Sequence, residues 1–227
     1  MAKLIELRDV YKIYGEGLES EVRALDGVSL DIEKGEFVAV VGQSGSGKST
    51  MMNVLGCLDI PTRGTYRLDG VDVRELSDKE LSRIRNKQIG FIFQQYNLIS
   101  YLTGLENIEL AMTETDNAIP KNQKEVAYAL LEKFGIVKSK ADRLVTKLSG
   151  GEQQRVAIAR AISTNAEVIL ADEPTGNLDV DTAAGIVKIF KELAHEDKKC
   201  VIAVTHSEAF AAEADVVVRL EKKKLQD

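Results

Sequence analysis

Apolar and polar residues alternate through the first thirty-odd residues of the chain. The runs LIELRDVYKIY and RALDGVSLDIEKGEF, with Val28, Leu30 and Ile32 on one face, predict strands with a single buried side. The run Phe37 to Val41 does not alternate, which predicts a strand covered on both faces. GTYRLDGVDV predicts a hairpin, and QIGFIFQQ predicts a second buried strand.

Between residues 105 and 148 the apolar period changes to that of a helix. Val126, Leu130 and Phe134 stand four apart and predict one stripe of an amphipathic helix within a helical insert. KSTMMNVLGCL and RVAIARAIS predict two further helices. AEVILADE and CVIAVTH predict short buried strands that flank a helix over DTAAGIVKIFKELAHE. This alternation predicts an α/β fold with a parallel, doubly wound sheet.

The length and the order of these elements predict one domain over residues 1–227. We expect a catalytic core with an N-terminal antiparallel β subdomain over about residues 1–95 and 165–227. We expect the helical subdomain over about residues 100–160.

Composition excludes several classes of protein. With 30 basic and 36 acidic residues the net charge is −6, so no nucleic-acid partner is expected. No apolar run approaches the roughly 20 residues that cross a bilayer, and no signal-peptide pattern opens the chain, so we expect a soluble protein that reaches a membrane only through a partner. The two cysteines are too few for a disulfide framework or a metal cluster.

A glycine-rich stretch follows the first buried strand and fits the pattern G-x-x-x-x-G-K-[ST] of phosphate-binding loops. Glycines let backbone N–H groups converge on phosphate oxygens, and the following helix adds positive charge at its N-terminus. Lysine would reach the β- and γ-phosphates and serine would offer a hydroxyl to Mg²⁺. The alternative is a surface turn, which this context disfavours. The predicted nucleotide-binding residues are Gly42, Ser44, Gly45, Ser46, Gly47, Lys48, Ser49 and Thr50.

Two carboxylates end the apolar strand VILADE. Asp172 is expected to hold Mg²⁺ through water, together with Ser49, and Glu173 to polarise an attacking water as general base. The alternative is a carboxylate pair that caps a strand or the next helix.

The segment LSGGEQQRVAIAR resembles the signature sequence of ATP-binding cassette (ABC) ATPases, a family whose fold is a P-loop NTPase core. Ser149 also suits a helix N-cap, and the glycines Gly150 and Gly151 before a helix make a second anion-receptive end. A single site needs only one such end. The resemblance implies a homodimer in which two chains sandwich two ATP molecules, each completing the site of the other.

The resemblance covers essentially the whole chain and implies roles for further residues. Tyr14 would stack on adenine, the alternative being a strand tyrosine near the surface. Gln94, in preference to its neighbour Gln95, would sense Mg²⁺ and the attacking water. Asp179, in GNLD, would lie in the loop that crosses the dimer seam. His206 would contact the γ-phosphate and Glu173 as a catalytic residue, whereas His195 is expected to be merely solvated.

Among ABC ATPases the chain is most similar to those of lipoprotein-releasing, macrolide-export and peptide-antibiotic-resistance transporters, on LGCLDIPTRGTY, IGFIFQQYNL and LADEPTGNLD. It departs from them in LISYLT, which lacks a proline, and in RLEKKKLQD, which lacks an Asp-Gly turn. The resemblance implies an ATPase that works with integral membrane permease subunits. It would be cytoplasmic and peripheral on the inner face of the cell membrane, docked through residues 94–106.

An alternative function is a regulatory or mechanical ATPase that acts on a membrane protein without moving cargo. A chromosome-organising or DNA-repair ATPase is disfavoured, because the chain has neither heptad runs nor cysteine clusters.

Overall fold

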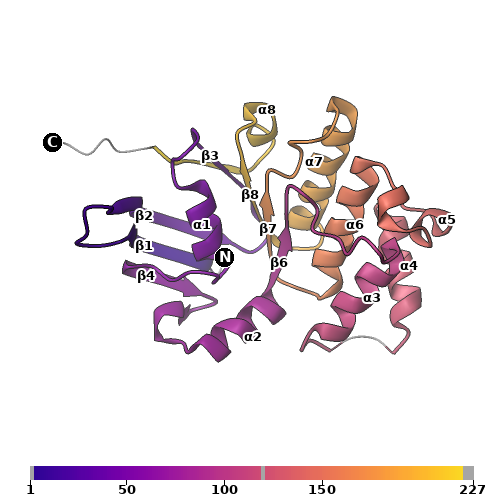
Figure 1. Cartoon of the computed structure of the whole chain (residues 1–227), viewed down its shortest axis with the longest axis horizontal. Coiled ribbons are helices and arrows are strands. Elements are labelled where there is room, and N and C mark those ends of the chain that lie inside the picture. Colours follow the sequence, from indigo (N-terminus) through magenta and orange to yellow (C-terminus); the bar gives the residue numbers. More distant parts are fainter. Residues whose placement is uncertain (1–2, 119–120, 222–227) are drawn as a thin grey trace.

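The computed structural model describes residues 3–118 and 121–221, and this part of the chain forms two β-sheets flanked by helices (Figure 1). A four-stranded antiparallel sheet has the order β2-β1-β4-β5, and a five-stranded sheet has the order β6-β7-β8-β3-β9. The pairs of the second sheet are all parallel. This arrangement confirms the predicted α/β fold with a parallel core and an N-terminal antiparallel sheet.

The strands of the described residues lie close to the predicted runs, except β9, which the sequence analysis did not predict. They are β1 (Lys3–Tyr14), β2 (Val22–Glu33), β3 (Phe37–Val41), β4 (Arg63–Leu68), β5 (Val71–Asp72), β6 (Ile89–Ile92), β7 (Val168–Asp172), β8 (Cys200–Thr205) and β9 (Val216–Arg219).

Along the sequence, most of the α-helices lie between consecutive strands of the parallel sheet. They are α1 (Lys48–Leu55), α2 (Asp78–Gln88), α3 (Gly104–Glu114), α4 (Gln123–Lys133), α5 (Lys138–Ala141), α6 (Gly150–Ser163), α7 (Val180–His195) and α8 (Glu208–Ala211). Two short 3₁₀ turns cover Val73–Glu75 and Val145–Lys147.

The parallel sheet separates two apolar cores. Alternate residues of β7 point to opposite faces, so Val168 and Leu170 pack with α1 and the antiparallel sheet. Ile169 and Ala171 pack instead with α3, α4, α6 and α7. In Figure 1, α1 lies to the left of β6, β7 and β8, whereas α6 and α7 lie to their right. The two helices α1 and α6 are thus on opposite faces of one sheet.

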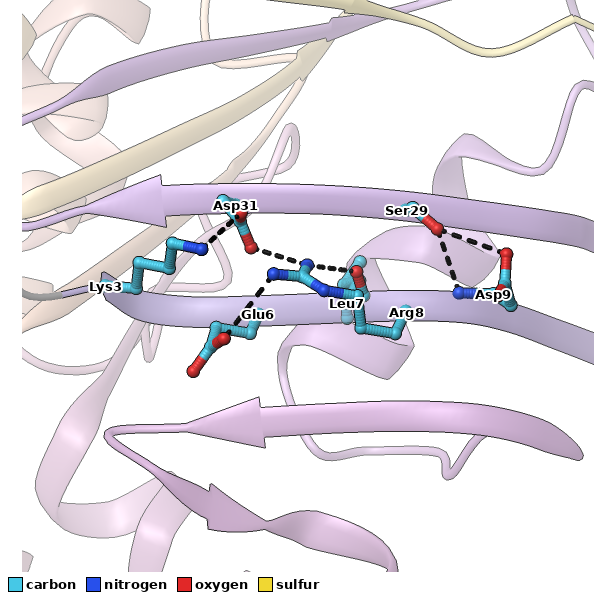
Figure 2. Close-up of polar contacts among 7 residues, drawn as sticks. All are labelled: Lys3, Glu6, Leu7, Arg8, Asp9, Ser29 and Asp31. Atoms are coloured by element: carbon cyan, nitrogen blue, oxygen red, sulfur yellow. Dashed lines mark hydrogen bonds and ion pairs between the residues drawn. The ribbon is translucent and has the colours of Figure 1, made fainter.

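A bulge shapes the antiparallel sheet. The register between β1 and β2 shifts between Leu7 and Val10, where Asp9 has a positive φ of 47°. The backbone N–H of Asp9 donates to the Ser29 hydroxyl at 2.9 Å, so a side chain replaces the lost ladder bond. In the same pair of strands, Asp31 of β2 forms ion pairs with both Lys3 and Arg8 of β1 (Figure 2).

The helical prediction needs one correction. On α4 the fully buried positions are Ala127 and Leu131, whereas the predicted stripe residues Val126 and Leu130 are only partly buried. Phe134 follows the helix and is buried as expected. Val126 and Leu130 nevertheless pack against the same apolar core as Ala127 and Leu131, so the buried face of α4 is wider than the predicted stripe.

His195 is also not merely solvated, so that prediction was wrong. Its Nε2 lies 2.9 Å from a carboxylate oxygen of Asp215, and Asp215 in turn accepts the backbone N–H of Phe37 at 2.8 Å. The ring therefore links the end of α7 to the segment before β9.

Two further predictions concern the surface and the sulfur atoms. Among the described residues, no helix combines the length and apolarity that a membrane span requires. Cys57 and Cys200 are buried free thiols, as expected of small core residues.

Candidate functional site

The glycine-rich stretch forms a tight loop between β3 and α1. Gly45 and Gly47 have positive φ values of 76° and 94°, a region that L-residues rarely adopt. A Cβ on Gly47 would lie only 2.1 Å from the carbonyl oxygen of Ala24 on β2. The position therefore admits only glycine, and the close approach to β2 fixes the start of α1.

This loop has the chemistry to receive an anion. The helix α1 begins without a side-chain cap, so no capping side-chain oxygen accepts a hydrogen bond from its first backbone N–H groups. The Ser46 hydroxyl is buried and makes no hydrogen bond within the described residues. The Lys48 ammonium donates to the carbonyl oxygens of Gly42 at 2.7 Å and Gln43 at 3.0 Å. Uncapped N–H groups, a free hydroxyl and an ammonium in one loop fit a phosphate chain.

Glu173 and His206 are neighbours at the carboxyl ends of β7 and β8. Glu173 has φ 43°, and its backbone N–H donates to the Val204 carbonyl at 2.8 Å. One carboxylate oxygen lies 2.8 Å from His206 Nδ1, and the other accepts the Thr205 hydroxyl at 3.1 Å. The same oxygen accepts the His206 backbone N–H at 3.3 Å. The carboxylate is thus oriented from three directions while it remains partly accessible.

Asp172 precedes Glu173 and lies in its field. Burial and the Glu173 carboxylate raise the pKa of Asp172, and the Lys48 ammonium opposes that rise. Three charges from β7 and α1 are therefore close enough to influence one another. The pair of carboxylates has an unbalanced negative charge that a divalent cation would neutralise.

Gln94 is exposed just beyond β6 and lies against the loop that follows Glu173. Its backbone carbonyl accepts the Asn177 amide at 3.4 Å. An ideal Cβ on Gly176 would be 3.3 Å from the Gln94 side-chain nitrogen and 3.6 Å from Glu173 Cβ. Gln94 and Glu173 therefore both lie close to Gly176.

The signature segment begins α6 with a complete capping box. The Ser149 hydroxyl accepts the Glu152 N–H at 3.3 Å, and the Glu152 carboxylate accepts the Ser149 N–H at 2.9 Å. Lys140 pairs with Glu152, and this contact lowers the pKa of the Glu152 carboxyl. The hydrogen bond from the Ser149 N–H lowers that pKa further, by a smaller amount. The predicted N-cap role of Ser149 is confirmed. As acceptor in this contact, the hydroxyl keeps its own proton for another partner.

Asp179 caps the neighbouring helix α7. Its carboxylate accepts the Thr182 N–H at 2.9 Å and the Thr182 hydroxyl at 2.7 Å. These hydrogen bonds lower the pKa of Asp179. A Cβ on Gly151 would be 2.4 Å from the Thr182 methyl group, so the signature glycine packs directly on this cap. Asp179 and the signature are thereby joined within one chain.

Tyr14 ends β1 and leaves 40% of its surface exposed. Its hydroxyl donates to Asp59 at 2.9 Å. Burial and the hydrogen bond to Asp59 raise the pKa of Tyr14, against an opposing hydrogen bond with Thr50. The ring is therefore anchored beside the first turn of α1 with an accessible surface.

The predicted site residues fall into two groups. The phosphate loop, Asp172 and Glu173 lie at the ends of β3 and β7, with His206 and Gln94 beside them, and Tyr14 lies beside Thr50 of α1. The signature residues 149–151 belong to α6, which packs on the other face of the sheet. The sequence analysis missed Thr205, although its position directly before His206 was an available signal. It also missed Asp59, because no local sequence pattern indicates the contact of Asp59 with Tyr14.

Comparison with known proteins identifies relatives of this chain. A family model described as "ABC transporter" matches residues 25–176. The macrolide export ATP-binding/permease protein MacB of Hyphomonas neptunium is 48% identical over 222 residues, which are 98% of this chain and 34% of that protein. The chain thus spans about a third of that relative. An ABC transporter ATP-binding protein of Thermotoga maritima is 46% identical over 230 residues, covering 100% of this chain and 95% of that protein.

Solved structures give the same picture. A dimeric structure of MJ0796, a bacterial ABC transporter cassette, superimposes with a TM-score of 0.84 at 42% identity, covering 98% of this chain and 99% of the other. A second structure of that cassette, also with a TM-score of 0.84, is a dimer in a post-hydrolysis state bound to ADP and Pi.

Proposed function

Because this chain belongs to the ABC transporter family and is one of its ATP-hydrolysing, ATP-binding domains, we propose that it works as a dimer closed around ATP. In this dimer the phosphate loop of one copy faces the signature helix of the other. Each active site is then completed in trans, and hydrolysis reopens the dimer.

One observation carries this proposal. The phosphate loop leads into α1 on one face of the parallel sheet, and Ser149 begins α6 on the opposite face. A helix N-terminus attracts anions in general, and the sheet stands between these two helices. A second copy supplies the missing partner without rearranging the sheet. The dimeric cassette of the 42% identical relative supports this arrangement.

The chain's own residues would divide the chemistry. Lys48 and the loop N–H groups hold the phosphates, and Tyr14 stacks on adenine. Glu173 takes a proton from the attacking water, while His206 holds that carboxylate and contacts the γ-phosphate. Ser149 and Gly151 of the second copy donate to the same phosphate.

We also propose that Ser49, Asp172 and Gln94 hold Mg²⁺, which would neutralise charge developing on the phosphates. The unbalanced charge of Asp172 beside Glu173 supports this assignment.

The work of closure would be delivered to a membrane permease. The relatives named MacB carry ATP-binding and permease parts in one protein, which supports an export role for macrolide-, lipoprotein- or peptide-like cargo here. The chain would then be cytoplasmic, held on the inner face of the membrane by that partner. The alternative is a mechanical ATPase that bends a membrane protein without cargo, and an assay of cargo movement separates the two.

Mixing two defective copies tests the composite site. Lys48→Ala removes the phosphate ammonium and Ser149→Ala removes the signature hydroxyl, so each variant alone should be nearly inactive. A heterodimer retains one intact composite site and should recover up to about half of the wild-type turnover of a dimer with two working sites. Size-exclusion chromatography with two different tags verifies that heterodimers form.

Glu208→Gln is the control variant, because Glu208 pairs with Arg219 on the surface. A heterodimer of Glu208→Gln and Lys48→Ala should hydrolyse ATP at one of its two sites, the one that uses the phosphate loop of the Glu208→Gln copy. Absence of recovery in verified heterodimers of the two defective copies would contradict a site shared between chains.

A further inference from the structure

A cluster of three side chains surrounds the ring of Tyr14. Its hydroxyl donates to one carboxylate oxygen of Asp59 at 2.9 Å. The Lys12 ammonium donates to the other oxygen of Asp59 and lies 5.0 Å from the centre of the Tyr14 ring. One carboxylate therefore holds both the hydroxyl and the cation packed on the ring.

The cluster is built into the fold rather than laid on the surface. Lys12 and Tyr14 stand two apart on β1 and so share one side of the strand. Asp59 follows α1, and its backbone N–H donates to the Asn53 carbonyl at 3.1 Å. The Lys12 side chain is 13% exposed and that of Asp59 is 26% exposed, so water screens the pair only partly.

The contacts also stabilise the charged form of the carboxylate. Burial opposes ionisation of Asp59, but the hydrogen bonds from Lys12 and Tyr14 outweigh it and lower its pKa. The ammonium is fixed a second time by the Ile60 carbonyl at 3.0 Å. These bonds fix the position of the ring before any ligand arrives, which reduces the ordering cost of stacking.

We propose that Asp59 and Lys12 are positioning residues that hold the Tyr14 ring in the orientation that receives the nucleotide base. The inference rests on the proposed function, in which Tyr14 stacks on adenine. It adds a base-orienting cluster in which Asp59, from the segment after α1, holds a ring that lies beside the first turn of that helix. Neither residue belongs to the phosphate loop, so their effect should depend on the presence of a base.

Two ligands separate base contacts from phosphate contacts. MgATP uses both, whereas magnesium tripolyphosphate offers phosphates alone, and calorimetry gives an affinity for each. Tyr14→Ala should weaken MgATP binding about 5- to 100-fold, the range of one aromatic–base stack. Asp59→Asn and Lys12→Met should each weaken it about 3- to 10-fold. Tripolyphosphate affinity should change less than about twofold in all three variants.

A double variant tests the route of the effect. In a Tyr14→Ala background, Asp59→Asn should weaken MgATP binding no further, because no ring remains to be oriented. Glu208→Gln, which breaks an exposed ion pair, is the matched control and should change neither affinity.

The outcomes distinguish the inference from the function beneath it. If Tyr14→Ala lowers MgATP affinity selectively and Asp59→Asn does not, the positioning role is wrong while base stacking stands. If Asp59→Asn lowers both affinities together, the residue merely supports the fold and the inference is also wrong. If Tyr14→Ala has no base-dependent effect, adenine stacking and the positioning role both fall.

Discussion

At the scale of single residues, the most informative backbone belongs to Glu173. A non-glycine residue at φ 43° is strained, and here the Val204 carbonyl, Thr205 and His206 all hold it in place. The strain directs the carboxylate away from the end of β7 and towards His206. A position of this kind suits an assigned chemical task better than a packing role.

Glu173→Gln should retain ATP binding and lower turnover about 10²- to 10⁴-fold, because the amide cannot accept a proton from water. Single-turnover hydrolysis and nucleotide affinity, measured on the same protein, check the two parts. Glu167→Gln makes the same change at the opposite end of β7, where Glu167 pairs with Lys34, and should leave turnover unchanged. If Glu173→Gln hydrolyses ATP at the wild-type rate, Glu173 is not the general base.

The raised pKa of Asp172 predicts acid-sensitive binding of MgATP. A carboxyl with a raised pKa takes up its proton, as the pH falls, before an ordinary aspartate does. Affinity for MgATP should therefore begin to decline, on acidification, at a higher pH than an ordinary aspartate would produce, and Asp172→Asn should lose this component of the decline.

The same shift has a stability consequence of opposite sign. Because the folded chain binds this proton more tightly than the unfolded chain, ionised Asp172 lowers stability at pH values above its raised pKa, and the loss disappears as the pH falls through it. Nucleotide-free Asp172→Asn should consequently melt at a higher temperature near neutral pH. A lower melting temperature would contradict the shift.

At the scale of elements, α6 connects the signature to the segment after β6. Arg160 donates from α6 to the carbonyl oxygens of Tyr96 at 3.1 Å and Asn97 at 2.5 Å. Both acceptors have positive φ, 61° and 48°. A Cβ on Gly150 would be 2.9 Å from the Tyr96 hydroxyl, so the same turn also covers the signature. Movement of either element should displace the other.

Arg160→Lys should destabilise the protein by about 1–3 kcal/mol, because the planar guanidinium reaches the two carbonyl oxygens through two separate nitrogens and lysine replaces it with a single, more strongly hydrated ammonium. Urea unfolding measures the free energy of unfolding. Arg219→Lys changes a pair that is exposed on the surface and should cost about 0–1 kcal/mol. Equal losses in the two variants would show that the turn does not depend on Arg160.

Much of the parallel core could be predicted because its strands are continuous apolar runs, as in β3. The Asp69-Gly70 hairpin and the Ser149 cap were likewise local signals. Helix α2 was missed because Leu81 is its one fully buried side chain, although Ser77 and Glu80 form a capping box that the sequence contains. The contact of Lys12 with Asp59 joins residues 47 apart, and no local rule pairs them.

At the scale of the whole molecule, two exposed apolar side chains lie on neighbouring segments of the helical part of the chain. Tyr101 is 77% exposed and Leu144 is 42% exposed. Thr103 and Leu144 form an isolated antiparallel bridge, so the segment before α3 lies next to the segment before α6. The first of these segments includes part of residues 94–106, the proposed docking region for a permease.

Tyr101→Glu combined with Leu144→Glu should abolish co-purification with the membrane protein that accompanies the wild-type chain. Basal ATP hydrolysis should persist, since neither side chain is among the proposed catalytic or nucleotide-binding residues. Val217→Glu alters a comparably exposed apolar residue on β9 and should retain the partner. Retention of the membrane protein by the double variant would place the docking surface elsewhere.

The placement of α1 and α6 on opposite sides of one sheet implies a rate law. If turnover requires both helix starts, isolated chains should hydrolyse ATP with second-order dependence on protein at high dilution, and specific activity should fall as the sample is diluted. A permease that carries two cassettes would convert this encounter into an intramolecular one and remove the dilution effect. Association with the permease would then set the rate of ATP hydrolysis as well as the work that hydrolysis drives.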